Sequence, residues 1–251
     1  MTVLIWSLIP LLFGLQMGIF EAGHLLSKRL PRATIDKALL PATASVLPLI
    51  ALVLALSFSD AASRLDASRQ TILAEVNAIG SVWRGIDIAA PEARPRLADL
   101  IRRYTDARIR AYQALPNLAA YEREVAAGNA FREEVSTLAA AATPDTPKGV
   151  FLLAAIDKVD DTATARALSL RIHLPPLALG YLFGIVLIGA LIVGMALAST
   201  GSRQWFHRTL VALVMTMIVY VIVDLEFPRI GPFQLLAPAD ALLLELRKSM
   251  G

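Results

Sequence analysis

The sequence predicts an all-α integral membrane protein in which four transmembrane helices carry a helical extramembrane domain between the second and the third. Two observations lead to this fold class. Of the 251 residues, 56% are apolar and 18% are charged, whereas a soluble domain has about 45–50% apolar and about 25% charged residues. The excess apolar residues are concentrated in four blocks, and no useful length of chain alternates with the period of a β-strand.

Each block can cross a bilayer, which takes about 20 apolar residues in a helix. The third block has no charge over 25 positions, which is too long and too uniform for a buried helix of a soluble protein. The first is followed, not preceded, by Lys28 and Arg29, so we expect an uncleaved helix and not a signal peptide. The blocks cover residues 3–20, 38–58, 174–198 and 209–223, and the fourth can extend to 227.

The apolar blocks and the segments between them divide the chain into four parts. The expected parts are residues 1–58 with transmembrane helices 1 and 2, residues 59–172 as the helical extramembrane domain, residues 173–228 with transmembrane helices 3 and 4, and residues 229–251 as an amphipathic segment. In the last part, an apolar run ends in Arg247 and Lys248, which predicts a short helix on the membrane or on a partner subunit.

Apolar residues recur at helical spacing through the predicted extramembrane domain. The first of these stripes continues directly from the second block, which predicts one long helix that crosses the membrane and projects beyond it. The stripes cover residues 65–83, 97–112 and 118–138, a Pro-containing loop covers 142–149, and a fourth helix starts near 150. The segment 59–172 has 15 basic and 15 acidic residues, so it offers no excess of positive charge to a nucleic acid.

The side of the membrane that the domain faces stays open. Basic residues of the short loops favour an external domain by the positive-inside rule; these are Lys28, Arg29, Arg32, Lys37, Arg203 and Arg208. Basic residues near the opposite membrane ends favour a cytoplasmic domain; these are Arg64, Arg69, Arg166, Arg171 and Arg229.

The residues that enzyme chemistry needs are sparse. The chain has no cysteine, which excludes disulfides and thiolate chemistry. The three histidines, His24, His173 and His207, lie at membrane boundaries without a second ligand at metal-binding spacing. Nucleophile, zinc and phosphate-loop motifs are absent from the sequence. We therefore expect no enzyme activity, no metal and no cofactor.

Candidate pore residues lie on the second block. Ile50, Leu54 and Phe58 follow one another at intervals of four and share a helix face. Repeated around an axis, such a face would form a hydrophobic neck that gates by dewetting, with Asp60 and Arg64 at its mouth. The alternative is that these residues simply face lipid or pack against other helices.

Two motifs follow the second and the fourth block. The first is Glu75-x-Asn77-Ala-Ile-Gly80 with Asp87 downstream, and the second is Asp224-x-x-x-Pro228-x-x-Gly231. With Arg102-Arg103-Tyr104, they resemble a bacterial bestrophin-like membrane family, distantly similar to bestrophin ion channels. The run Phe58-Ser-Asp-Ala-Ala-Ser63-Arg64, followed by Arg69 and by Val76-Asn77, resembles the pattern that bestrophins have just beyond their second membrane helix. Leu65 and Asp66 stand where that pattern has tryptophans. We expect the residues of the two motifs to have a structural role.

The resemblance implies a homo-oligomer, with a pentamer favoured, around an axial pore lined by the second helix. It implies a bacterial inner membrane protein that conducts small inorganic ions, with anions such as chloride favoured, and whose helical domain is cytoplasmic. The alternative is a non-conducting scaffold or sensor whose helical domain binds a partner. Lipid and other copies of the chain are the expected partners, and nucleic acid is not.

Overall fold

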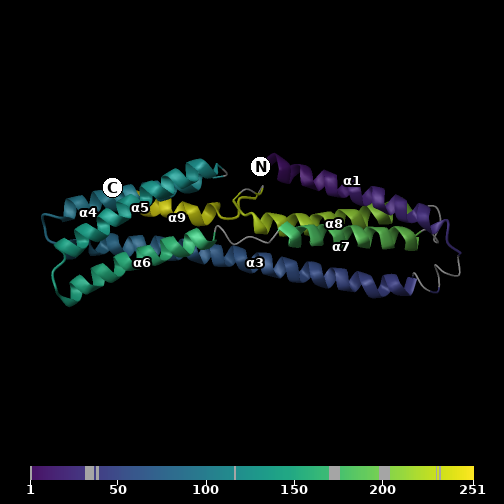
Figure 1. Ribbon diagram of the computed structural model, residues 1–251, viewed down its shortest axis with the longest axis horizontal. Helices are drawn as coiled ribbons and strands as arrows, with labels where there is room; N and C mark the ends of the chain where they lie inside the picture. The colour runs from purple at the N-terminus through teal and green to yellow at the C-terminus, as the bar shows by residue number, and fades with distance from the viewer. Residues whose placement is uncertain are drawn as a thin grey trace. The chain divides into compact units, whose positions relative to one another are not determined.

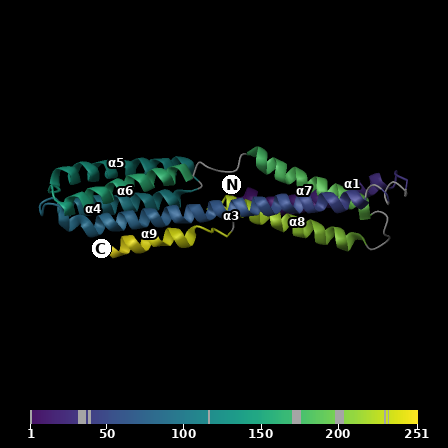
Figure 2. The ribbon, with the colours of Figure 1, turned by 90° about the horizontal axis from the view of Figure 1, so that it is seen from below.

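The computed structural model describes residues 2–31, 37, 40–115, 117–169, 176–197, 204–229, 231 and 233–251, and every regular element in them is helical (Figures 1 and 2). The elements are α1 (Thr2–Ser27), α3 (Leu40–Gly85), the 3₁₀ helix η2 (Ile86–Ile88), α4 (Arg94–Ala114), α5 (Leu118–Ala142), α6 (Pro147–Ser169), α7 (Pro176–Ala196), α8 (Gln204–Glu226) and α9 (Ala237–Ser249). Four residues that the sequence analysis used lie outside the described residues: the basic residues Arg32, Arg171 and Arg203, and the histidine His173.

Four of these helices are long and apolar enough to cross a membrane, which confirms the predicted number. The candidate spans are Ile9–Ser27, Pro41–Ile88, Leu179–Ala196 and Trp205–Glu226. The long helix that the sequence predicts is α3, which runs without interruption for 46 residues, or about 69 Å at 1.5 Å per residue.

The chain folds as two compact units. The first unit comprises Met1–Arg64 and His173–Phe233, and the second comprises Leu65–Ile172 and Gln234–Gly251. Helix α3 contributes residues 40–64 to the first unit and residues 65–85 to the second. The second unit thus includes the C-terminal helix α9 together with α4, α5 and α6.

In the first unit, α1 packs against both α7 and α8, as Figures 1 and 2 show. The closest approach is between α1 and α7 and depends on two glycines. A Cβ atom on Gly194 would lie 2.4 Å from the carbonyl oxygen of Phe20, and one on Gly23 would lie 2.5 Å from that of Leu191. Since only glycine lets two backbones approach this closely, these residues fix the crossing of α1 and α7.

A polar contact also joins α1 to α8 inside the first unit. The Gln16 side-chain amide donates to the hydroxyl of Thr216 at 2.8 Å, and both side chains are buried. Side-chain hydrogen bonds of this kind between membrane helices are worth about 0.6–2 kcal/mol. The contact fixes the rotation of α1 relative to α8.

The second unit has its own apolar core, formed by α3, η2, α4, α5, α6 and α9 around residues such as Ile79, Leu97 and Ile101. Helix α9 differs from the prediction that it lies on the membrane or on a partner subunit. Its Leu243 is fully buried in this core, and Arg247 pairs with Asp106 of α4 at 2.7 Å. The apolar face of α9 is therefore used within its own chain, a packing that sequence periodicity alone does not specify.

The α1–α7 crossing gives a direct test of the first unit. We expect Gly194→Ala to lower the free energy of unfolding in detergent by about 2–3 kcal/mol, because the added methyl group collides with backbone that cannot move cheaply. Gly184→Ala, on the same helix, is the control: a Cβ atom there meets nothing within 4 Å. An equal loss of stability in the two variants would contradict the packing described.

Candidate functional site

One face of α3 in the first unit is left uncovered. Its residues recur at intervals of three and four and are all exposed; they are Ser45, Leu49, Leu52, Leu56, Ser59, Asp60 and Ser63. We call this set the open face of α3. The hydroxyls of Ser45 and Ser63 donate to the carbonyl oxygens four residues before them, so both are satisfied within the helix.

The three predicted neck residues differ in burial within the single chain. Ile50 and Leu54 are only 1% and 2% exposed and belong to the apolar core of the first unit, with Leu182 and Val186 of α7 and Ile222 of α8. Side chains held inside the chain's own core are not available to line a pore. The spacing of four identified a helix face correctly but could not tell the buried face from the open one.

The third predicted neck residue, Phe58, is 45% exposed. It follows Leu56 by two positions, which turns it about 200° around the helix, so it does not continue the open face. The leucines that do lie there are Leu49, Leu52 and Leu56, which are 60%, 55% and 59% exposed.

The two predicted mouth residues differ in their charge balance. The guanidinium of Arg64 donates to the carboxylate of Glu226 at 2.9 Å, and the Glu226 side chain is only 2% exposed. Asp60 is exposed and forms no ion pair with any residue that the structure describes. The negative charge of Asp60 therefore has no ion-pair partner among the described residues, whereas Glu226 neutralises the positive charge of Arg64.

The motif after the fourth membrane helix closes over a buried carboxylate. Asp224 is 2% exposed, and a Cβ atom on Gly231 would lie 2.0 Å from its Oδ1 atom. Pro228 lies in a turn that follows α8. This turn is closed by a hydrogen bond of 2.8 Å from the N–H of Gly231 to the carbonyl oxygen of Phe227. A side chain at position 231 would force the Asp224 carboxylate to move, which favours glycine there.

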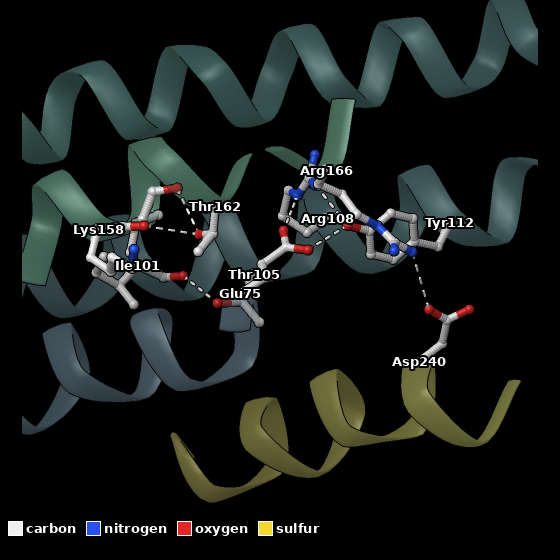
Figure 3. A network of polar contacts seen from close by, with 10 residues as sticks. Glu75, Ile101, Thr105, Arg108, Tyr112, Lys158, Thr162, Arg166 and Asp240 are labelled. Atoms are coloured by element: carbon white, nitrogen blue, oxygen red, sulfur yellow. Dashed lines mark hydrogen bonds and ion pairs between the residues drawn. The ribbon is translucent and has the colours of Figure 1, made fainter. Parts of the chain in front are cut away.

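The first motif contributes to a buried polar network in the second unit (Figure 3). Glu75 of α3 is fully buried and forms an ion pair with Arg108 of α4. The Tyr112 hydroxyl donates to the other carboxylate oxygen of Glu75 at 2.6 Å and accepts a hydrogen bond from Arg108 at 2.6 Å. Each carboxylate oxygen of Glu75 therefore has a partner, as a buried charge requires.

Burial raises the pKa of Tyr112, and the Glu75 carboxylate beside it raises that pKa further. Burial by itself would lower the pKa of Arg108, but its neighbours, including Tyr112 and Glu75, outweigh that effect and raise it. Both groups consequently keep their protons at neutral pH. The Tyr112 hydroxyl therefore remains a hydrogen-bond donor beside the ion pair of Arg108 and Glu75.

Arg166 of α6 extends the network and had not been singled out from the sequence as a site residue. Its guanidinium is fully buried, lies 4.9 Å from the centre of the Tyr112 ring and donates to the carbonyl oxygen of Ser68 on α3. It also lies 3.9 Å from Asp240 of α9. Helices α3, α4, α6 and α9 are thus joined through polar contacts, which no local spacing in the sequence could reveal.

The other residues of the first motif are placed differently. Asn77 and Asp87 are exposed. Gly80 is buried, and a Cβ atom there would lie 3.6 Å from Leu246 of α9. Within the described part of the chain, no group of three or more His, Asp or Glu residues could hold a metal ion.

A family model identifies the family of this chain, and solved structures show the same fold. The model of the Bestrophin-like domain matches residues 11–236. Three solved structures of a bacterial bestrophin homolog from Klebsiella pneumoniae, each with one substitution, superpose with TM-scores of 0.72, 0.72 and 0.73 at 15%, 13% and 15% identity. The matches cover 98% of this chain and 97%, 98% and 96% of the other. No curated protein matches the sequence.

The buried network predicts a large difference between two glutamates. We expect Glu75→Gln to destabilise the protein by about 3–5 kcal/mol, because it leaves the buried Arg108 without a counter-charge. Glu124→Gln breaks the exposed ion pair with Arg110, and there we expect at most about 0.5 kcal/mol. Thermal unfolding of the purified full chain measures both, and similar shifts for the two variants would contradict the structural role of Glu75.

Proposed function

This chain belongs to the Bestrophin-like domain family, and on that premise we propose that it forms an ion channel in the bacterial inner membrane. In this proposal several identical copies surround a central axis, and the open face of α3 lines the pore. Five copies are the number that the family resemblance favours.

The observation that carries the proposal is how little α3 is covered. Only 11% of the apolar window of α3 is buried, against 22%, 33% and 39% in the spans of α1, α7 and α8. Helix α3 therefore leaves more of its surface to other molecules than any of the other three spans. Lipid, water or further copies of the chain must cover that surface.

The composition of the open face favours water over lipid. Ser45, Ser59 and Ser63 lie on it, and so does the charged Asp60. A charged or polar side chain is costly against hydrocarbon and typically faces an aqueous cavity. A ring of copies with these faces turned to the axis gives them such a cavity without requiring one inside a single chain.

The leucines of the open face supply the narrow part of the proposed pore. Leu49, Leu52 and Leu56 lie within two helical turns, with serines on both sides along the helix. Rings of leucines repel water from a constriction, which is how a hydrophobic gate blocks ions. The proposed neck thus moves from Ile50 and Leu54 to these three leucines.

The family resemblance favours anions, but Asp60 opposes them at the mouth of the proposed pore. Because Glu226 neutralises Arg64, the exposed charge near this end of the open face is negative. A ring of carboxylates attracts cations and repels anions. We therefore propose that Asp60 reduces the preference for anions that the resemblance implies.

The neck can be tested by ion flux. Replacing Leu49, Leu52 and Leu56 together by alanine should raise the conductance in liposomes several-fold, because smaller side chains let water enter the constriction. The matched control replaces one exposed leucine from each of the helices α1, α7 and α8, namely Leu11, Leu177 and Leu213, and we expect no change in conductance. No flux from either the native chain or the neck variant would contradict the channel proposal.

The charge at the mouth can be tested separately. We expect Asp60→Asn to shift the reversal potential in a salt gradient toward that of the anion, because the variant loses one negative charge per subunit. Asp66→Asn is the control, since Asp66 is already paired with Arg69. A shift toward the cation in Asp60→Asn would contradict this role.

A further inference from the structure

One end of the first unit gathers basic side chains. There α1 ends at Ser27 and α8 begins at Gln204, and both views show these two helix ends close together (Figures 1 and 2). Lys28 and Arg29 follow α1 directly, are exposed, and have no acidic partner among the residues that the structure describes. Two full positive charges are therefore available to a ligand.

The third cation at this end, Arg208, is held in place by Glu21. The Arg208 guanidinium donates to the Glu21 carboxylate at 2.7 Å, and the arginine side chain is 10% exposed while that of the glutamate is 56% exposed. The charged groups that act on the neighbouring His24 imidazole are Arg208, Lys28 and Glu21. These four side chains therefore lie near one another. Two of them, Arg208 and Lys28, are cations, and one, Glu21, is a carboxylate. The exposed Arg29 is a further cation at this end.

Two polar atoms at this end have unused hydrogen-bonding capacity. The Nδ1 atom of His24 and the Oγ atom of Ser27 are buried and have no partner in the described part of the chain. Buried polar atoms without partners cost free energy and are uncommon in native proteins. Unmet capacity beside a surplus of positive charge is typical of a place where a further polar group binds.

Aromatic side chains place this end at the level of lipid headgroups. Trp205 and Phe206 open α8, are 65% and 56% exposed, and stand edge to face with their ring centres 6.3 Å apart. Exposed aromatic residues at the end of an apolar helix are characteristic of the membrane–water interface. A ligand bound here by charge would therefore meet the protein within the headgroup layer.

The opposite end of the first unit has no such surplus among the residues that the structure describes. Asp60, Asp224 and Glu226 are acidic there, Arg64 and Arg229 are basic, and Arg64 is paired with Glu226. Within the first unit, the surplus of exposed positive charge therefore lies at the end formed by α1 and α8.

We propose that Lys28, Arg29 and Arg208, with His24 beside them, bind the phosphate of an anionic phospholipid headgroup. The two exposed cations attract the lipid, and Trp205 and Phe206 pack against the upper part of its acyl chains. Arg208 contributes part of its charge, because Glu21 competes for it. This lipid site is separate from the proposed pore face and does not depend on ion conduction.

The test titrates the purified full chain with phosphatidylglycerol and, in parallel, with uncharged phosphatidylcholine, and follows the bound lipid by native mass spectrometry. Each surface cation is worth about a fivefold factor in affinity for an anionic membrane lipid. Lys28→Ala with Arg29→Ala should therefore weaken phosphatidylglycerol binding about 30-fold. The control, Lys148→Ala with Lys248→Ala, removes the same charge from exposed positions of the second unit and should change nothing.

A third variant guards against a mere folding defect. Glu21→Gln releases Arg208 from its competing carboxylate, so we expect tighter binding of phosphatidylglycerol, which a damaged protein would not show. Equal losses in the two double variants, or equal binding of the two lipids, would overturn the proposal. Displacement of phosphatidylglycerol by millimolar inorganic phosphate would also overturn it, because the site would then take free phosphate and not a lipid.

Discussion

The stripe of side chains that α3 buries decides what the rest of the molecule can do. In the first unit, Ile50, Leu54 and Ala61 of α3 are buried among the apolar side chains of α7 and α8, and burying each large apolar side chain is worth about 1.5–3 kcal/mol. Once this stripe is buried, the rotation of the helix is fixed. The leucines and serines on its other side are left for lipid, water or other copies of the chain.

Polar contacts fix the same helix in the second unit. Glu75 is held by Arg108 and Tyr112, and the backbone of Ser68 accepts a hydrogen bond from Arg166. Replacing such a buried ion pair by apolar side chains often leaves stability unchanged, whereas breaking it is costly. We therefore interpret the network as a device that specifies one arrangement of α3, α4, α6 and α9.

The sequence predicted the elements well because their signals are local. An apolar block of about 20 residues rarely forms any structure other than a membrane-spanning helix. Apolar residues at helical spacing located the helices of the second unit. Local signals could not choose between faces: Ile50 and Leu54 have the spacing of a pore face, but their partners in α7 and α8 lie more than 100 residues away. Arg166 and the packing of α9 were missed for the same reason, whereas the resemblance of the Asp224–Gly231 motif pointed to the right family.

If the open face of α3 meets water in a pore, a water-soluble reagent must be able to reach its side chains. The chain has no cysteine, so single cysteines can be introduced without background, and the most direct measurement is the reactivity of Leu52→Cys with a charged thiol reagent during ion flux. We expect rapid modification and block of the flux for the cysteine at position 52, and neither for a cysteine at the buried position 50. If the charged reagent fails to modify Leu52→Cys and only a lipid-soluble reagent labels it, the open face meets lipid and not the water of a pore.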